Sequence, residues 1–220
     1  MSAVTALFTR TADRARDVVG LLAGTDEMSN ADRERWAQAR SLADVGELTA
    51  RWLEGDVQAL PTYRVPCDVD EHLAPGMTDT LVALNRAGMV THQSQGGHAD
   101  DDYQQQAAVS GYAEPALADR IRETTAGEPN LVVADLADRD QRRQAPVGWH
   151  ASPRELRDDW TGYGICHPDA VAELVAAEQV CVYDREPGRN DRLWPALQAA
   201  ADQRVAEAAA IQDDDAVDEW

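Results

Sequence analysis

The residues best suited to bind a small molecule lie in the segment 81–97, with the sequence LVALNRAGMVTHQSQGG. Its pattern predicts a helix that ends at Gly88 and then a strand whose far end is crowded with hydroxyl and amide groups. A Gly-Gly loop follows, where a backbone without side chains can approach a ligand closely. Polar groups in this arrangement suit a site that hydrogen-bonds a small polar ligand. They are Thr91, Gln93 or His92, Ser94 and Gln95.

The same side chains also have a purely structural explanation. Thr91, Ser94 and Gln95 are able to satisfy backbone groups at the point where a strand passes into a loop. The spacing of the residues is compatible with both explanations, so both stay open at this point.

The histidines of the chain form no recognisable metal motif. His92 and His98 fall within one strand-and-loop element, where the acidic residues 100–102 could join them as metal ligands. Their spacing matches no HExxH, H-x-E or CxxC pattern, and acidic loops are usually solvated. We therefore expect no metal site.

The common catalytic motifs are absent as well. Cys166 and His167 are adjacent, which is a poor geometry for a nucleophile and its base, and Cys181 lies in an apolar stretch typical of a core residue. The sequence has no GxSxG, P-loop or GxGxxG pattern. An enzyme would need His92, His98 or Cys166 to converge on one pocket, so we expect no catalytic residue.

The chain is strongly acidic. Its 220 residues include 40 acidic and 20 basic side chains, for a net charge of −20, and every basic residue is Arg. Such a surface repels phosphate backbones and anionic lipids, which excludes ordinary binding of DNA, RNA or membranes. It leaves small-molecule binding, binding to a basic protein partner, or acidity that serves only solubility. The absence of Lys fits a GC-rich coding bias and an adaptation to salt equally well.

The length and the apolar pattern favour a single soluble domain. No apolar run approaches the roughly 18 residues that a membrane span requires, and residues 1–24 lack the regions of a signal peptide. Three scattered cysteines do not describe a disulfide framework. We therefore expect a cytoplasmic protein of one domain.

Helices and strands alternate along the chain. Apolar residues recur at three- and four-residue steps over 4–22, which predicts an amphipathic helix, and Ser29 and Ser41 are suited to cap the next two helices. Further helices are expected at 78–87, 115–125 and 168–177, and from Asn190 or Asp191 until the chain frays near Gln212. Strands are expected near 63–65 and at 89–93, 105–112, 131–136, 145–150 and 179–183. This order predicts an α+β or mixed α/β fold.

The segment LNRAGMVTHQSQGG resembles N-R-x-G-x-L-T-x-x-S-Q-P in the C-terminal regulatory domain of eukaryotic methylenetetrahydrofolate reductase, which binds S-adenosylmethionine. The likeness continues in order along the chain. QQQAAVSGYA is similar to the Q-K-A-Y-x-E-F-F strand of that domain, and PVGWHASPRE to its T-W-G-I-F-P-G-R-E turn. QVCVYDREPGRNDRLWPAL resembles its closing strand, acidic loop and D-N-C-L-W helix. The resemblance covers roughly residues 67–197.

The chain also resembles an uncharacterised bacterial family of stand-alone proteins. The shared segments are ADxGELTARWLEG, LNRAG, SQ and GRNDRLWPAL, and together they cover roughly residues 28–197. The catalytic barrel of the reductase, a fold of about 250 residues, has no counterpart in this chain. The resemblance therefore implies a binding domain and no folate or flavin chemistry.

The resemblance implies a fold of side-by-side mixed β-sheets surrounded by helices, and it implies a ligand site. Thr91 and Ser94 match the Thr and Ser that contact S-adenosylmethionine in the regulatory domain. The Pro of the S-Q-P segment is Gly96 here.

Two other contacts of that domain are altered. Its Glu-Thr pair has Glu71 and His72 as the nearest match, with a small offset, and a Thr ahead of its W-G-I-F turn would fall near Val147, where no hydroxyl is present. The turn here runs through Trp149. The implied pocket lies between the Glu71 region, the Thr91–Ser94 strand end and the Val147–Trp149 turn.

We therefore expect a non-catalytic small-molecule-binding or sensor domain over 28–200, with a helical extension at 1–27 and a partly disordered acidic, Ala-rich tail at 201–220. The expected ligand is S-adenosylmethionine, S-adenosylhomocysteine or a related adenine nucleotide. The alternatives are an acidic inhibitor that binds a basic partner as a nucleic-acid mimic would, and a phage or host protein that sequesters a nucleotide signal. The extension at 1–27 either packs onto the domain or mediates formation of a homo-oligomer.

Overall fold

The fold is described from a computed structural model, which defines residues 28–61, 71–72, 74–147 and 162–217. The helix expected at 4–22, the strand expected near 63–65, and Trp149 lie outside these ranges. The helices are α2 (Asn30–Gln38), α3 (Leu42–Leu53), α4 (Met77–Arg86), α5 (Pro115–Thr125), α6 (Arg139–Gln144), the short 3-10 helix η2 (Tyr163–Ile165), α8 (Pro168–Ala176) and α9 (Leu193–Val217). The strands are β1 (Met89–Gln95), β2 (His98–Ala99), β3 (Gln104–Gln105), β4 (Ala108–Ala113), β5 (Leu131–Asp135) and β6 (Glu178–Asp184).

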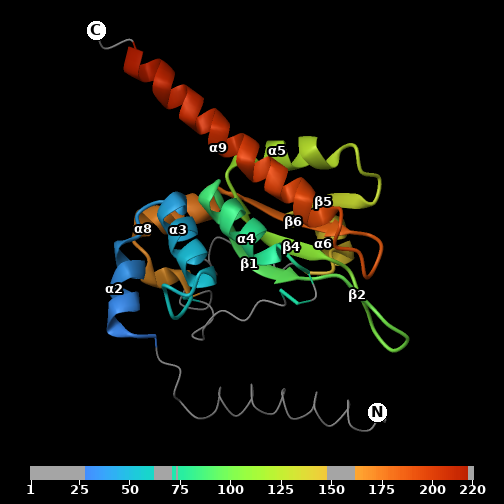
Figure 1. Ribbon diagram of the computed structural model, residues 1–220. Coiled ribbons are helices and arrows are strands. Elements are labelled where there is room, and N and C mark those ends of the chain that lie inside the picture. The colour runs from blue at the N-terminus through green and yellow to red at the C-terminus, as the bar shows by residue number, and fades with distance from the viewer. Residues whose placement is uncertain (1–27, 62–70, 73, 148–161, 218–220) are drawn as a thin grey trace.

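The predicted α+β class is confirmed. Four strands form one sheet in the order β1-β4-β6-β5, and β2 and β3 form a separate hairpin that projects from the body (Figure 1). The expectation of sheets with mixed strand directions is wrong for the part of the chain that is described, because each pairing there is antiparallel. Strand β6, the last in the sequence, lies between β4 and β5 and pairs antiparallel with both.

The predicted helix caps are confirmed for α2 and α3. The Ser29 hydroxyl accepts a hydrogen bond from the N–H of Asp32 at 3.0 Å. Ser41 and Asp44 form a complete capping box, in which each side chain accepts from the backbone N–H of the other residue. Helices with these caps begin where the sequence predicts because their first N–H groups are satisfied locally.

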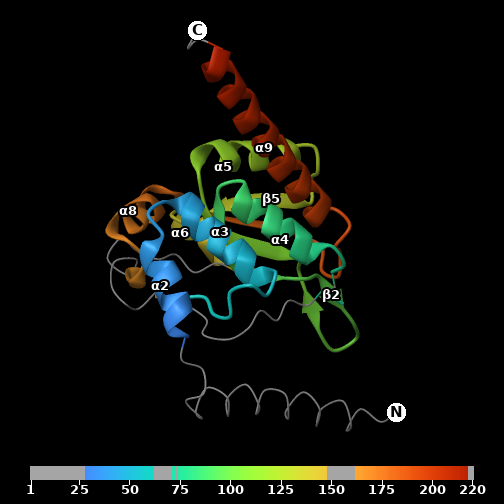
Figure 2. The same cartoon turned by 60° about the vertical axis from the view of Figure 1, so that its left-hand side comes forward.

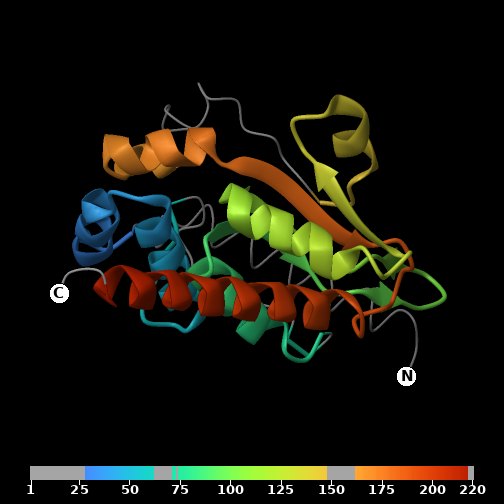
Figure 3. The same ribbon diagram turned by 90° about the horizontal axis from the view of Figure 1, so that it is seen from above.

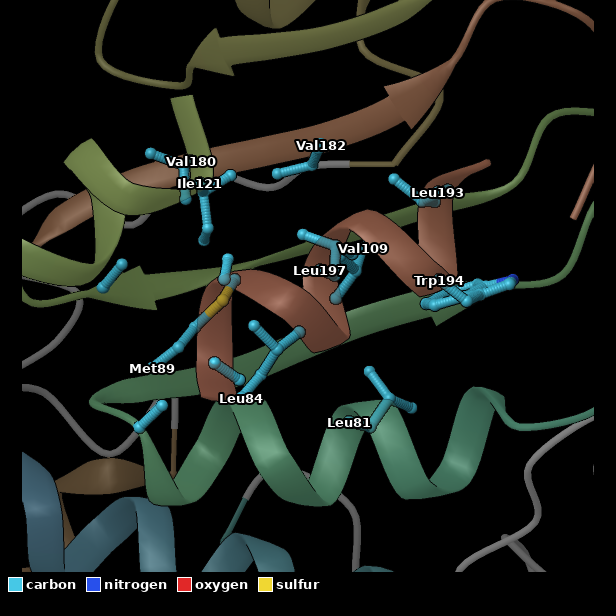
Figure 4. Packing of buried hydrophobic residues seen from close by; sticks show 14 of the residues in the cluster. Leu81, Leu84, Met89, Val109, Ile121, Val180, Val182, Leu193, Trp194 and Leu197 are labelled. Carbon is cyan, nitrogen blue, oxygen red and sulfur yellow. The ribbon is translucent and has the colours of Figure 1, made fainter. Parts of the chain in front are cut away.

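One face of the sheet is covered by α4, α5 and α9. Figure 3 shows α5 and α9 lying side by side across this face, and Figure 4 shows their apolar side chains packed with those of α4 and the strands. We call it the α4–α9 face, and its core is one continuous apolar cluster. The cluster includes Leu81, Leu84, Met89, Val109, Ile121, Val180, Val182, Leu193, Trp194 and Leu197.

The opposite face is covered differently. We call it the Tyr112 face, because strand alternation places Val90, Tyr112, Ser110 and Cys181 on it together. At one end, Val90 and Tyr112 pack with α3, η2 and α8, which gather beside α2 at that end of the sheet (Figure 2). At the other end lies a smaller apolar cluster. It contains Ala108, Ala134, Leu136, Cys181 and Tyr183.

Two expected elements differ from the structure, and one helix was not expected. The strand expected at 145–150 is wrong in its described part, because 145–147 contains no strand and follows directly on α6. Helix α6 was not expected; it forms because the carboxylate of Asp138 accepts from the N–H groups of Asp140 and Gln141 and so caps it. The strand expected at 105–112 is two strands, β3 and β4.

The last helix also differs from the expectation. Asn190 does not act as a simple cap for α9, since its side chain accepts from the N–H of Gly97 and donates to the carbonyl of the same glycine. Helix α9 begins at Leu193 and continues to Val217, through the region expected to fray. Figures 1 and 2 show its C-terminal part projecting beyond the rest of the described fold.

Candidate functional site

A β-bulge at His92 divides the polar residues of β1 between the two faces of the sheet. Thr91 pairs with Gly111 of β4 and Gln93 pairs with Ser110, so the register shifts by one residue at His92. The His92 ring lies against the Tyr112 ring, with centroids 6.2 Å apart and planes at 63°. This contact places His92 on the Tyr112 face. Because residues directly opposite in a sheet share a face, Gln93 lies on the Tyr112 face beside it.

Thr91 lies on the α4–α9 face and is hydrogen-bonded to α4. Asn85 donates from its side-chain amide to the Thr91 hydroxyl at 2.8 Å, and the N–H of Thr91 donates to the Asn85 side-chain oxygen at 3.1 Å. The Asn85 amide also donates to the carbonyl of Leu81. The hydroxyl and the backbone N–H of Thr91 therefore both hold β1 to the end of α4. This is the structural explanation of Thr91 that the sequence left open.

Ser94 and Gln95 diverge. Ser94 pairs with Val109, whose side chain is in the α4–α9 core, so Ser94 lies on that face and is half-buried. Gln95 pairs with Ala108 on the Tyr112 face, and its amide donates to the carbonyl of Gln106 at 2.8 Å. The two adjacent polar residues therefore cannot line one pocket from the same side.

A polar band crosses the Tyr112 face between its two apolar clusters. We define it by His92, Gln93 and Ser110, which come from two adjacent strands. Ser110 is only 1% exposed, while His92 and Gln93 are half-buried. Burial lowers the pKa of His92, so the imidazole is neutral near pH 7 and has one donor and one acceptor nitrogen. The band therefore combines hydroxyl, amide and imidazole groups without a fixed charge.

Aromatic rings border the band at its α3 end. The Tyr112 ring, against which His92 packs, is itself in edge contact with Tyr163 of η2, with centroids 6.2 Å apart and planes at 87°. Ser110, Tyr112 and Tyr163 were not predicted as site residues. The available signal was the single hydroxyl of Ser110 within the otherwise apolar run AVSGYA.

Val147 lies on the Tyr112 face, where its backbone N–H approaches the thiol of Cys181. Thr91 and Ser94 lie on the other face, so the sheet separates their side chains from Val147. The pocket expected between these residues is therefore not assembled from their side chains. Trp149, the remaining residue of that turn, is outside the described ranges.

Glu71 caps the start of α4. Its carboxylate accepts from the N–H of Gly76, and from both the N–H and the hydroxyl of Thr78 at 2.9 and 2.7 Å. Partial burial opposes ionisation, but these hydrogen bonds from Thr78 and Gly76 outweigh it and lower the pKa of Glu71. Glu71 and the neighbouring His72 are both exposed. The structure thus gives Glu71 a helix-capping role at the start of α4.

Replacing Glu71 with alanine is expected to reduce the free energy of unfolding by about 1 kcal/mol at pH 7, because α4 loses its cap. A carboxyl whose pKa is lowered by folding stabilises the protein above its unfolded pKa, near 4.5, and loses this effect as the pH falls through its folded pKa. The difference between variant and wild type should therefore shrink below pH 4. Urea unfolding at pH 7, 5 and 3.5 measures it. Glu34→Ala, at an exposed position in α2, is the control, and an equal loss there would contradict the capping role.

The residues considered for catalysis belong to different elements of the fold. His98 lies in the β2–β3 hairpin, where it pairs with Asp100 at 2.9 Å and packs beside Tyr103. Cys166 is buried near Tyr163, and burial raises its pKa to about 12. Burial raises the pKa of Cys181 to about 12 as well. Neither thiol is ionised near pH 7, so neither is suited to be a nucleophile.

Part of the acidic loop 100–102 stabilises the turn that the loop itself forms. One oxygen of Asp100 accepts from the N–H groups of Asp102 and Tyr103, and the other pairs with His98. Within the described ranges, no group of three or more His, Cys, Asp or Glu side chains is placed to hold a metal ion.

The SQGG and GRND segments meet in space, although more than ninety residues separate Gly97 from Asn190. Besides the paired hydrogen bonds between these two residues, a Cβ added to Gly97 would lie 2.5 Å from the carbonyl oxygen of Arg189. The glycine is therefore required by the close approach of two backbones. This contact gives both segments a structural role at the edge of the sheet.

Comparison with known proteins adds one match. A family model described as "Domain of unknown function (DUF6919)" matches residues 31–204, a range that includes every strand described above and most of the helices. None of the curated proteins matches the chain. In the described part of the fold, no helix has the length and apolar character needed to cross a bilayer.

Proposed function

The chain belongs to the DUF6919 family, and we propose that it is a non-catalytic domain that binds a small molecule at the polar band. The observation that supports this proposal is the contrast between the two faces of one sheet. The α4–α9 face carries a continuous apolar cluster. The Tyr112 face has two apolar clusters with His92, Gln93 and Ser110 between them.

The contrast is informative because the two faces distribute their polar groups differently. The α4–α9 face has one continuous apolar cluster with Thr91 and Ser94 beside it, whereas the polar residues of the Tyr112 face lie between two separate clusters. Small-molecule sites resemble the second arrangement, with a few convergent polar groups set among apolar and aromatic side chains.

The ligand that we propose is S-adenosylmethionine, S-adenosylhomocysteine or a related adenine nucleotide. The sequence resemblance to the regulatory domain of methylenetetrahydrofolate reductase supports this class, and its most specific motif includes β1, the strand that contributes His92 and Gln93. The band itself has neutral hydrogen-bonding groups, which suit a nucleobase or a ribose hydroxyl. The net charge of −20 favours the sulfonium and thioether compounds over a phosphorylated nucleotide.

Isothermal titration calorimetry of the full chain tests this function. Separate titrations use S-adenosylmethionine, S-adenosylhomocysteine and AMP, and L-methionine serves as the control that lacks the adenosine half. We expect saturable binding of at least one adenosine compound and none of L-methionine. The absence of both heat and a thermal shift at millimolar concentrations of every adenosine compound would exclude this ligand class.

A further inference from the structure

We infer that the N-terminal segment 4–22 packs as a helix along the free end of α9 in the same molecule. The free end is the part of α9 that follows Arg204 and projects beyond the rest of the described fold (Figures 1 and 2). The segment itself lies outside the described residues, so its side of the contact comes from the sequence. The contact is independent of the proposed ligand site, which lies on the sheet.

The inner face of α9 continues past the helices that cover it. Leu197 and Ala201 of this face are buried in the α4–α9 core. Steps of three or four residues extend the same face through Arg204 and Ala208, which are half-buried, to Ile211. Ile211 is 61% exposed, the largest value among the big apolar side chains that the structure describes. The free end of α9 therefore presents the continuation of a core face, left largely uncovered by the described part of the chain.

Both segments lie outside the family domain. The family model matches residues 31–204, so its match begins after the N-terminal segment and ends where the free end of α9 begins. The helix predicted over 4–22 has an apolar stripe, and an amphipathic helix owes most of its stability to the packing of that stripe. Two additions to one domain, each with an apolar side to bury, are suited to cover each other.

The charges of the two segments are complementary. Residues 205–220 include six acidic and no basic side chains, whereas residues 1–24 include three Arg and two Asp. The acidic residues 213–215 lie near the C-terminal end of α9, where the helix dipole disfavours negative charge. Arginines from the N-terminal segment offset this charge. Pairing of the free end with the same helix of a second copy would instead bring like charges together, which disfavours that occupant.

The length of the N-terminal segment and the place where it joins the fold also fit the contact. A helix over 4–22 is about 28 Å long, against about 20 Å for the part of α9 beyond Arg204. Residues 23–27 connect the segment to Met28, just ahead of α2. Figures 1 and 3 show α9 running towards the end of the molecule at which α2, α3 and α8 gather. The segment therefore joins the fold at the end towards which α9 extends.

Hydrogen–deuterium exchange of the full chain, followed by mass spectrometry, tests the contact. In the wild type, the amides of 4–22 are expected to exchange about 10- to 100-fold more slowly than in an unfolded chain, the effect of burying one Ile side chain. Ile211→Asp is expected to remove this protection from 4–22. Phe8→Asp, on the apolar stripe of the N-terminal segment, should in turn speed exchange over 205–217. Exchange over β4 and β6 should stay unchanged in both variants, which establishes that the domain is folded.

Val205→Asp is the matched control. Val205 is also exposed, at 51%, but it lies six residues before Ile211 and is therefore turned from it by about a third of a turn around the helix. The control places the same charge in the same helix away from the inner face, so exchange over 4–22 should change less than twofold.

Three results would overturn the inference. The first is unprotected exchange over 4–22 in the wild type, and the second is an equal response of 4–22 to Ile211→Asp and Val205→Asp. The third comes from light scattering, by which the wild type is expected to be a monomer. A dimer that Ile211→Asp converts to a monomer would show that the free end of α9 binds a second copy instead of the chain's own N-terminal segment.

Discussion

Replacing Asp184 with alanine is expected to lower the free energy of unfolding by about 3 kcal/mol, because it leaves a largely buried guanidinium without its main partner. Asp184 is 0% exposed, and both of its oxygens accept from Arg192, at 2.8 and 2.9 Å. One of these oxygens also accepts from the N–H of Glu186. Arg192 is 16% exposed and has a second contact with the carboxylate of Glu186, which places the cost at the lower end of the range for a broken buried pair.

Urea unfolding monitored by tryptophan fluorescence measures this change. Asp191→Ala is the matched control. Asp191 lies seven residues after Asp184 and makes the same kind of two-oxygen contact, with Arg189, but at an exposed position. Exposed pairs of this kind contribute little because water screens the charges and the side chains lose entropy. Similar losses in the free energy of unfolding of the two variants would show that burial does not determine how much the Asp184–Arg192 pair contributes to stability.

The sequence predicted the elements whose signals are local. The boundaries of α5 were predicted to the residue because Pro115 occupies its first turn, and α3 began where the Ser41 and Asp44 pattern placed it. The strand LVVAD was recognised because β-branched residues between a Pro and a charged run are typical of a buried strand.

The candidate site was harder to predict because it depends on which way each side chain of β1 points. Strand alternation assumes a regular register, and one bulge reverses the facing of all residues beyond it. Whether Thr91 is available to a ligand depends on Asn85, and only the packing of α4 against β1 brings these two side chains together. The polar character of β1 could therefore be predicted, whereas its division between two faces could not.

The glycines of the resemblance motifs show a related limit. In the sequence, the Gly-Gly pair after β1 is compatible with close approach to a ligand. In the structure, Gly97 instead lies against Arg189 and exchanges hydrogen bonds with Asn190. A glycine pattern indicates that something comes close to the backbone, but the partner is set by tertiary contacts between distant segments. A motif shared between proteins can therefore reflect a structural contact at the edge of a sheet as readily as a binding site.

Replacing Trp36 with alanine is expected to be the most damaging single change considered, with a loss of about 3–5 kcal/mol in the free energy of unfolding. Trp36 is 0% exposed and lies in the cluster that joins α2, α3, η2 and α8 to the Tyr112 end of the sheet. Its indole N–H donates to the carbonyl of Ala59 at 3.0 Å. The substitution therefore opens a cavity and leaves a buried carbonyl without its donor, and both effects act in the same direction.

The location of Trp36 gives this prediction a second consequence. Because Tyr112 and Tyr163 belong to the same cluster, loosening it should also weaken ligand binding at the neighbouring polar band. Urea unfolding gives the stability, and calorimetry with S-adenosylhomocysteine below the unfolding transition gives the affinity. Val205→Ala is the control, since Val205 is 51% exposed on α9 and its truncation should change stability by less than about 0.5 kcal/mol. A Trp36→Ala protein as stable as this control would contradict the assignment of a core role to α2. A loss of stability without any loss of affinity would show that the cluster stabilises the fold but does not affect ligand binding at the polar band.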